Sequence, residues 1–463
     1  MTYPETIKYL ESFINYEKIP AWPYKKSLKL ERIKDFLETI GNPQDNLSCI
    51  HIAGTKGKGS TCAFVTHILR EAGYKVGLYT SPHLSDFKER IRILKPKGAS
   101  LAPQEKEDFE GMILKNELTD LVNELKAPID KYNKKSKYGP LSFFEIYTSL
   151  AFAYFKEKNV NFVVLETGLG GRLDATNVVN PLVVAVTPIS YEHTQKLGVT
   201  LREIAAEKAG IIKKHQDTLP TGRQAKTQGH KLMVISAPQE KEAIEVIRKK
   251  CQDVGAKLYE VNKDIFYEAQ SEGFNVIGLF GEYPCLKIRF LGKHQLINAT
   301  VAVGVIEALR PYNTYIGIDS IRSGLYNTIW PGRCEIISKN PMIVLDGAQN
   351  IASSRALKKA IKDNFEYKRL ILTLGISNDK DIKGICSELS GLADEVVLTK
   401  ANNSRATEPK ILAKFFKHKN VHMTLNVKEA QTLVCGMAKK EDLILVCGSL
   451  FVVGEFRDAQ IQS

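Results

Sequence analysis

The chain has 463 residues, of which 43% are hydrophobic and 25% are charged, and its formal net charge is +13 at pH 7. This composition excludes a disordered chain and requires no membrane span, and a length of about 100–200 residues per domain predicts two or three domains. The positive charge favours an anionic partner, such as a nucleotide, a polycarboxylate or a nucleic acid, without choosing among them.

The cysteines and the first residues indicate a reducing compartment. The eight cysteines are scattered without a C-x-x-C pair, which argues against a zinc site or a disulfide framework, so we expect them to be reduced and mostly buried. Residues 1–5 lack the basic and apolar regions of a secretion signal, and no apolar run is long enough for a bilayer helix. We therefore expect a cytoplasmic protein.

The first predicted elements lead into a buried strand. Apolar residues at three- and four-residue spacing predict helices over residues 7–13 and 30–40, and Gly41-Asn42-Pro43 ends the second. The apolar run 49–53 then predicts a strand, and residues 61–72 have the pattern of a helix. A glycine-rich turn connects this strand to this helix.

That turn is Gly54-Thr55-Lys56-Gly57-Lys58-Gly59-Ser60. Its glycines let backbone N–H groups converge on an anion, the helix presents its positive end, Lys58 adds a mobile charge, and Ser60 supplies a hydroxyl suited to Mg²⁺. The turn departs from the usual G-x-x-x-x-G-K-[ST] pattern because Gly59 separates Lys58 from Ser60. A glycine turn without a ligand is the alternative, and it leaves Lys58 between two glycines unexplained. We predict a phosphate-binding loop.

Three further strands are predicted in the same parallel sheet. The runs 75–80, 161–165 and 182–187 are apolar, and each is followed by polar residues. In such a sheet the ligand-binding groups gather at the carboxyl ends of the strands. At this edge we expect Ser60, Ser81, Glu166 and His193, with Lys208 on the helix that follows.

Oxygen atoms dominate this group, and a hard cation that bridges nucleotide phosphates prefers hydroxyl and carboxylate ligands, so Mg²⁺ fits better than zinc. Glu166 ends an apolar strand, where an unpaired carboxylate is costly, and this favours a metal or ion-pairing role. Taken singly, the other residues have plain structural alternatives. His193 alone is as readily a hydrogen-bonded loop residue, Lys208 a solvated helix residue, and Asp174 a turn cap.

Polar segments interrupt the pattern. We predict a helix over residues 104–125, a solvated loop for the basic run 131–137, and an exposed loop over 213–231. Residues 142–145 open an apolar helix that runs to residue 155, and Thr200 to Glu203 has the spacing of a capping box for a helix through Lys208.

After residue 231 the sequence predicts two further regions, an antiparallel patch and a second α/β domain. Short alternating runs around residue 258, at 274–279 and at 286–290 predict a small antiparallel patch, and an apolar helix is predicted over 299–309. After a short helix at 319–327, strand-like runs alternate afresh with helices, at residues 342–345, 370–374, 395–399 and 443–446. The predicted fold is therefore α/β, with a P-loop-containing parallel-sheet ATPase domain at 1–328 and a smaller Rossmann-like α/β domain at 329–463.

Five segments together resemble the signature segments of the folylpolyglutamate synthase and dihydrofolate synthase family, which belongs with the Mur ligases. They stand in the family's order and span nearly the whole chain. They are Gly54-Thr55-Lys56-Gly57-Lys58-Gly59-Ser60, Tyr79-Thr80-Ser81-Pro82-His83-Leu84, Gly168-Leu169-Gly170-Gly171-Arg172-Leu173-Asp174-Ala175-Thr176-Asn177, Ala206-Glu207-Lys208-Ala209-Gly210-Ile211-Ile212 and Leu345-Asp346-Gly347-Ala348.

The resemblance implies an ATP-dependent amide ligase. In such enzymes a substrate carboxylate attacks the γ-phosphate to give an acyl phosphate, and the amine of glutamate then displaces phosphate. It implies a catalytic group of Lys58, Glu166, His193 and Lys208, two Mg²⁺ ions, and metal ligands Ser60, Ser81, Glu166, His193 and Lys208, the last as a CO₂-derived carbamate.

It also implies binding residues for each substrate. An Arg suits phosphate because its planar fork donates two hydrogen bonds at once. The implied ATP contacts are Gly54, Thr55, Lys56, Gly57, Lys58, Gly59, Ser60, Asn298, Arg333 and Asp346. The implied pterin contacts are Ser142, Phe143, Phe144, Glu145, Leu173, Asp174 and Ala175, and Ser449 is a weaker candidate for the incoming glutamate.

Two residues depart from the family pattern. Gln349 stands where the family more often has histidine, and Glu192 precedes His193 where aspartate is more common. Glutamine removes any ionic role at its position, whereas glutamate keeps the charge and lengthens the reach. The loop at 213–231 also looks inserted relative to the family.

The leading hypothesis is a ligase, a monomer acting on small molecules, that adds L-glutamate to dihydropteroate, to reduced folates or to both. Asp174 in the pterin loop favours the bifunctional case. A Mur ligase acting on a UDP-linked substrate is the nearest alternative, and Gly59-Ser60 and Ser81-Pro82-His83 favour the folate enzyme over it. An alternative of another class is a P-loop ATPase stimulated by nucleic acid.

Overall fold

The computed structural model describes residues 1–19, 22–99, 109–214, 231–417 and 420–461. It divides into two compact units. The first contains Met1–His83, Lys88–Arg289 and Gln295–Ile329, and the second contains Leu84–Phe87, Phe290–His294 and Trp330–Ser463.

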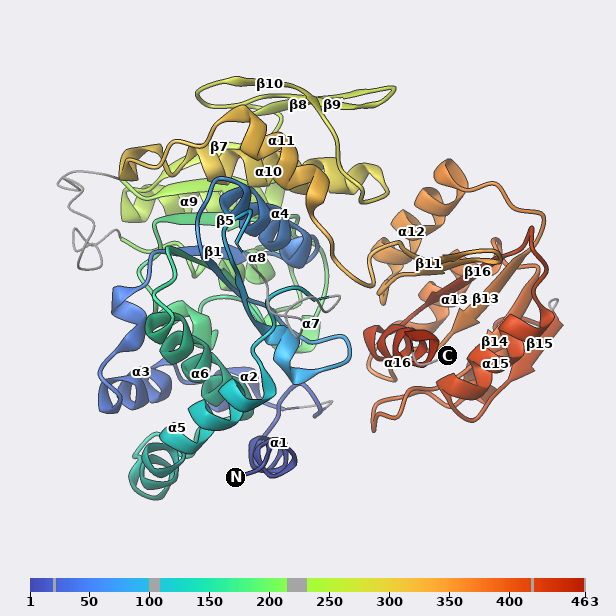
Figure 1. Cartoon of the computed structure of the whole chain (residues 1–463), viewed down its shortest axis with the longest axis horizontal. Helices are drawn as coiled ribbons and strands as arrows, with labels where there is room; N and C mark the ends of the chain where they lie inside the picture. Colours follow the sequence, from blue (N-terminus) through green and yellow to red (C-terminus); the bar gives the residue numbers. More distant parts are fainter. Residues whose placement is uncertain (20–21, 100–108, 215–230, 418–419, 462–463) are drawn as a thin grey trace. The chain divides into compact units, whose positions relative to one another are not determined.

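A seven-stranded sheet forms the core of the first unit (Figure 1). The strand order is β3-β2-β4-β1-β5-β6-β7, and all neighbours are parallel except β2 and β3. The central strands are continuous apolar runs because both faces are covered, as parallel sheets require. The strands are β1 (Cys49–Ala53), β2 (Val76–Tyr79), β3 (Ile91–Leu94), β4 (Phe162–Glu166), β5 (Val183–Val186), β6 (Met233–Ser236) and β7 (Lys257–Glu260).

Helices cover the two faces of this sheet. Figure 1 shows α3, α5 and α6 on one side and α4, α10 and α11 on the other. The capping box predicted at Thr200 and Glu203 begins α8, and Ser142 and Glu145 form a second one at the start of α6. The helices are α1 (Tyr3–Glu11), α2 (Tyr24–Ser27), α3 (Leu30–Thr39), α4 (Lys58–Glu71), α5 (Lys115–Lys135), α6 (Phe143–Glu157), α7 (Thr194–Leu197), α8 (Leu201–Ala209), α9 (Lys241–Val254), α10 (Lys293–Glu307) and α11 (Ile318–Asn327).

The helix predicted over 104–125 was placed wrongly. Residues 104–108 lie outside the described residues, and α5 runs from Lys115 through Pro128 to Lys135. The buried stripe continues past the proline, where Tyr132 packs edge-on against Phe36. Most of the basic run 131–137 is therefore the end of a helix, where lysines favour the negative end of the helix dipole, rather than a loop. Residues 215–230 of the predicted exposed loop lie outside the described residues.

The antiparallel patch exists, and the predicted run 274–279 is its central strand, but the other two strands differ from those predicted. It consists of β8 (Phe266–Gln270), β9 (Gly273–Ile277) and β10 (Glu282–Leu286), in the order β10-β9-β8. The run around residue 258 is instead β7 of the large sheet, and the run at 286–290 mostly follows β10. Short alternating runs do not specify their partner strand, which explains the error. The helix predicted over 299–309 begins six residues earlier, because its buried polar residues Gln295 and Asn298 hydrogen-bond to each other.

The second unit has a six-stranded sheet in the order β11-β12-β16-β13-β14-β15. The four predicted strands are confirmed as its parallel centre. The two strands that were missed lie at its edges. They are partly exposed and therefore lack the continuous apolar residues that predict a buried strand. The strands are β11 (Glu335–Lys339), β12 (Met342–Leu345), β13 (Leu370–Leu374), β14 (Glu395–Leu398), β15 (Asn420–Met423) and β16 (Leu443–Cys447), and the helices are α12 (Ile351–Asn364), α13 (Ile382–Ser390), α14 (Pro409–Ala413), α15 (Val427–Met437) and α16 (Leu450–Ile461).

The cysteines and the helices agree with the bulk predictions. Six of the eight cysteines are buried, and Cys285 and Cys435 are exposed. Among the described residues, no helix combines the length and the apolar character that crossing a bilayer needs.

Candidate active site

The predicted phosphate loop lies between β1 and the first turn of α4. Gly54 and Gly57 have φ of +150° and +84°, which favour glycine. A Cβ on Gly54 would lie 1.9 Å from Oγ1 of Thr187, and a Cβ on Gly57 would lie 2.1 Å from Oδ1 of Asn298. The loop is therefore held in a shape that only glycine permits, and Asn298 of α10 is one of the residues that enclose it.

Glu166, at the end of β4, connects this loop to the segment after β2. Its Oε2 accepts a hydrogen bond of 3.2 Å from the backbone N–H of Ser81, and its Oε1 lies 3.9 Å from Nζ of Lys58. Only 8% of the Glu166 side chain is exposed, and Ser60 is buried on the first turn of α4. The structure thus brings Lys58, Ser81 and Glu166 together, as the strand order predicts.

Lys208 is buried on the last turn of α8, 4% exposed, and its Nζ donates a 2.7 Å hydrogen bond to the backbone oxygen of Gly54. Burial, followed by the positive charge of Lys58, lowers the pKa of Lys208 to about 7. The negative charge of Glu192 opposes this shift. A lysine with this pKa is partly neutral at neutral pH, when its amine can act as a nucleophile.

His193 follows β5 and occupies the N-cap position of α7 with a left-handed backbone, at φ +52°. Such a conformation is uncommon outside glycine and is found preferentially at functional positions. Its neighbour Glu192 pairs with Lys56 at 3.0 Å, so the longer carboxylate of this chain reaches a lysine of the phosphate loop. This contact gives the glutamate departure a structural role.

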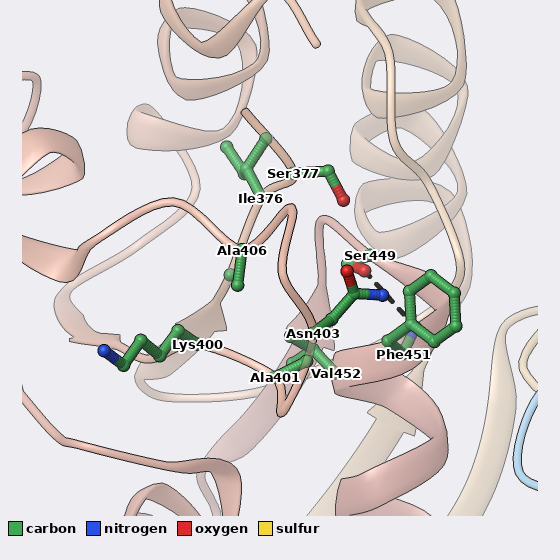
Figure 2. Close-up of a pocket in the computed structure, with 10 residues that line it drawn as sticks. Ile376, Ser377, Lys400, Ala401, Asn403, Ala406, Ser449, Phe451 and Val452 are labelled. Atoms are coloured by element: carbon green, nitrogen blue, oxygen red, sulfur yellow. Dashed lines mark hydrogen bonds between the residues drawn. The ribbon is translucent and has the colours of Figure 1, made fainter. Parts of the chain in front are cut away.

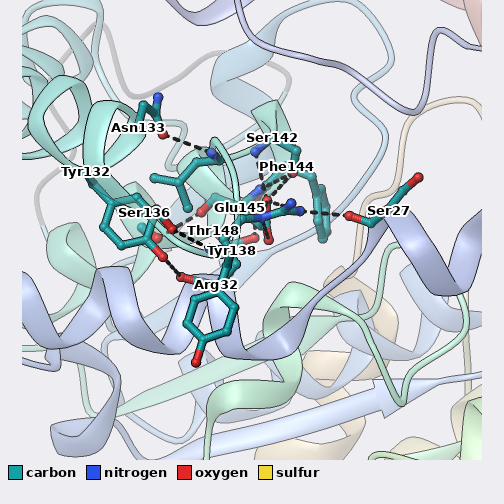
Figure 3. A network of polar contacts seen from close by, with 12 residues as sticks. Ser27, Arg32, Tyr132, Asn133, Ser136, Tyr138, Ser142, Phe144, Glu145 and Thr148 are labelled. Carbon is teal, nitrogen blue, oxygen red and sulfur yellow. Dashed lines mark hydrogen bonds and ion pairs between the residues drawn. The ribbon is translucent and has the colours of Figure 1, made fainter.

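The predicted pterin residues separate into an internal group and a surface group. Ser142 donates to Glu145 from its backbone N–H and its hydroxyl, and Glu145 pairs with Arg32 (Figure 3). Both are buried, and so is Phe143. Phe144 is partly exposed, and its ring would touch a Cβ on Gly168 at 2.7 Å. The structure therefore gives Ser142 and Glu145 a role in capping α6, whereas Phe144 offers an aromatic face.

Asp174 is buried within the loop after β4. Its Oδ2 accepts hydrogen bonds of 2.9 Å from the N–H groups of Gly168 and Leu169, and its Oδ1 accepts from the N–H and hydroxyl of Thr176. These four bonds use the acceptor capacity of the carboxylate within its own loop. Of its neighbours, Leu173 is partly exposed and Ala175 is buried. Direct contact of these residues with a pterin stays a prediction.

The second unit holds the remaining predicted residues. Asp346 follows β12 and accepts from the N–H groups of Cys334 and Ala348, at 2.9 and 2.8 Å. Arg333 is near this turn, because a Cβ on Gly347 would lie 3.5 Å from its Nη1. Ser449 follows β16 and accepts a 3.3 Å hydrogen bond from the N–H of Phe451.

Ser449 lines a small pocket in this unit (Figure 2). The pocket lies where β13, β14 and β16 end, the edge at which parallel sheets gather ligands. Its polar lining residues are Ser377, Lys400, Asn403 and Ser449. The Lys400 ammonium points away from Ser449 and pairs with Glu408, so the hydroxyl and amide groups are the ones that suit a small polar ligand (Figure 2).

Comparison with known proteins shows the family to which this chain belongs. Family models for the Mur ligase middle domain and for the Mur ligase, glutamate ligase domain match residues 133–306 and 332–450. The dihydrofolate synthase/folylpolyglutamate synthase of Bacillus subtilis is 31% identical over 457 residues, covering 96% of this chain and 99% of the relative. The chain belongs to the dihydrofolate synthase/folylpolyglutamate synthase family.

Solved structures agree over the whole length. Folylpolyglutamate synthase of Thermotoga maritima is 31% identical, with a TM-score of 0.80 and coverage of 98% of this chain and 96% of that one. Escherichia coli FolC, in complex with DHPP and ADP, is 26% identical, with a TM-score of 0.82 and coverage of 100% and 98%. As a member of this family, the chain is an ATP-dependent ligase.

Sequence reasoning missed the groups that hold this family site together. The Arg172 guanidinium donates to the Glu207 carboxylate at 2.8 Å, and the Arg172 backbone N–H donates to the backbone oxygen of Glu207. The Tyr24 hydroxyl donates to the same carboxylate. Glu207 precedes Lys208, so this pair fastens α8 to the loop after β4. Arg172 and Glu207 stand inside the family segments, but a sequence does not show which charges pair.

Proposed function

We propose that this ligase adds L-glutamate to dihydropteroate, to reduced folates or to both. Domain 1–328 would bind ATP and the pterin substrate, and domain 329–463 would handle glutamate. The observation that carries the proposal is the cluster of Lys58, Ser81 and Glu166 at a glycine-dependent phosphate loop, with buried Lys208 bonded to Gly54. The monomer and the cytoplasm belong to this proposal as well.

The chemistry needs positioning and charge neutralisation more than a strong acid or base. An oxygen of the substrate carboxylate attacks the γ-phosphorus of ATP, and ADP leaves. The amine of glutamate attacks the carbonyl carbon of the acyl phosphate, loses a proton, and phosphate departs with the bonding electrons. Lys58 and the N–H groups of the loop would orient the phosphates and offset their charge, and the side chain of Lys56, in the same loop, pairs with Glu192.

The donor atoms at the strand ends fit Mg²⁺. A buried carboxylate and a buried hydroxyl beside a phosphate loop supply hard oxygen ligands, and such ligands suit this ion. Ser60, Ser81, Glu166 and His193 would hold two Mg²⁺ ions, which would polarise the phosphates when bound.

Lys208 fits a carbamate. It is buried close enough to Lys58 to feel its charge, and its amine donates a hydrogen bond to the backbone oxygen of Gly54. Adding CO₂ turns the buried cation into an anion, which would offset the lysine charges of the loop and provide two oxygens for a cation. A carboxylate-like group at this place explains why a lysine would stand among cation ligands.

The Ser449 pocket would bind the incoming glutamate. Its hydroxyl and amide groups can accept or donate hydrogen bonds to an amino acid.

An ADP-release assay tests the proposal. Dihydropteroate and tetrahydrofolate are compared, each with and without glutamate, and we expect ATP turnover to require both a pterin substrate and glutamate. Turnover only with UDP-linked substrates would support the Mur alternative. ATPase activity stimulated by DNA or RNA, without pterin or glutamate, would support the nucleic-acid-dependent class and overturn the ligase proposal.

A further inference from the structure

A buried row of three side chains connects the strand that carries the phosphate loop to the loop after β4. His51 is in the middle of β1, fully buried, three residues before Gly54. Its Nε2 lies 2.8 Å from Oγ1 of Thr176, which lies 2.6 Å from Oδ1 of Asp174. Neither His51 nor Thr176 belongs to the site residues predicted from the sequence or implied by the family.

The protons in this row have one consistent arrangement. The other three hydrogen bonds to Asp174 all come from backbone N–H groups. An ionised carboxylate only accepts, so the hydroxyl proton of Thr176 points to Asp174. Thr176 must then accept from His51, which places the imidazole proton on Nε2. Nδ1 is left without a proton, and it is buried with no hydrogen-bond partner among the described residues.

The neutral form of His51 agrees with its surroundings. Burial, followed by the positive charge of Lys213, lowers the pKa of His51 to about 3. Because the ring does not gain a proton near neutral pH, it is a fixed donor rather than a switch.

The row ends at the residues that carry the proposed pterin site. Asp174 holds the N–H groups of Gly168 and Leu169, and the Phe144 ring packs against Gly168. We infer that His51 is a positioning residue for the pterin substrate: through Thr176 and Asp174 it fixes the start of the loop after β4 and the aromatic face beside it. This inference rests on the proposed function, because that function makes this loop a pterin site.

A buried histidine that only stabilises the core is the alternative, and paired variants separate the two. His51→Phe and Thr176→Val remove the donor or the relay, whereas His51→Gln and Thr176→Ser keep them. We expect the first pair to raise KM for the pterin substrate about fivefold to tenfold, the effect of one buried hydrogen bond, with KM for ATP within about twofold. The conservative pair should stay within about twofold of the wild type, and the double variant should resemble either single one.

Equal rises in both KM values, or a lower Tm with unchanged kinetics, would show a purely structural role. If His51→Phe fails to fold, nitrogen NMR of histidine-labelled protein decides, with the His51 signal assigned by its loss in His51→Gln. A proton on Nε2 supports the inference, and a proton on Nδ1 overturns it. A wild-type chain that is inactive with both pterin substrates would overturn the proposed function instead, while the NMR result would still test the row itself.

Discussion

The two sheets place polar groups at the same kind of edge, but they hold them differently. In the first unit, charged side chains meet one another and the backbone of a distant loop, as Glu166 does with Lys58 and Ser81, and Lys208 with Gly54. In the second unit, Asp346 and Ser449 accept hydrogen bonds from backbone N–H groups, two of them in their own turns and one from Cys334, twelve residues before Asp346. The first edge is thus fixed by charged side chains that reach distant segments, and the second by backbone N–H groups that hold Asp346 and Ser449. We expect substitutions at the first edge to impair chemistry and those at the second to weaken binding of one substrate.

The largest effect is expected at Gly57. A methyl group there would meet Asn298 at 2.1 Å, at a φ of +84°, so Gly57→Ala should deform the phosphate loop and lower kcat/KM on the order of a thousandfold. Gly255→Ala is the matched control, because its φ is +71° and nothing lies within 4 Å of the new methyl group. The control should lose about 1 kcal/mol of stability and keep its activity. Equal activity in both variants would contradict the tight loop.

The next effect concerns Lys208. Lys208→Met keeps most of the side-chain volume and removes the amine, so we expect ADP release to fall on the order of a hundredfold, with a control at the exposed Lys249. Intact-protein mass should show one added CO₂ on the wild type and none on the variant. Full activity of Lys208→Met without bicarbonate would exclude the carbamate role.

At the second edge the expected change is specific for one substrate. Ser449→Ala should raise KM for glutamate about tenfold, through loss of one hydrogen bond to a charged ligand, and leave KM for ATP within about twofold. Ser387→Ala, at an exposed position of α13, should leave both unchanged. A rise in KM for ATP alone would place the glutamate site elsewhere and remove the contrast between the edges.

The smallest effect is a pH dependence of stability in the first unit. Burial, followed by the charge of Lys34, lowers the pKa of Lys213 to about 8, and its Nζ donates to the backbone oxygens of Asn177 and Val179. Because the folded pKa is below the unfolded value of about 10.4, the folded state is disfavoured when the lysine is protonated, and its stability rises between about pH 8 and 10.4. Urea unfolding at pH 7 and pH 10 should show a gain of about 1–2 kcal/mol for the wild type relative to Lys213→Met. No difference between the two proteins would contradict the shift.

The sequence predicted the elements that carry strong apolar patterns. Strands β1, β2, β4 and β5, the parallel centre of the second sheet and the helices α6 and α8 were placed correctly, because burial on both faces and a capping box leave plain signals. The buried strand β6 was missed, and β7 was assigned to the antiparallel patch. Edge strands β3, β11 and β15 were missed, since edge strands need fewer apolar residues. The end of α5 was predicted too early, because prolines usually end helices. The helix instead continues through Pro128, and its buried face extends to Tyr132.

The sequence predicted the site residues at strand ends but not the residues that hold them in place. Topology alone brings strand ends together, so the meeting of Ser81 and Glu166 followed from the strand pattern. The strand pattern did not predict which side chains pair when distant segments pack together. Arg32 and Glu145 are 113 residues apart, and the hydroxyl between His51 and Asp174 is supplied by a third segment. Residues of this kind become visible only when the chain is folded.

The close approach of Asn298 to Gly57 also limits how the family sequence can change. Any side chain at residue 57 needs the space that the Asn298 amide fills, and shortening Asn298 alone removes a group that encloses the loop. The two positions are therefore coupled, and a selection for revertants of Gly57→Ala should recover second-site changes at residue 298. Such changes would be neutral or favourable only in the variant background, so the order in which substitutions arise decides which of them survive.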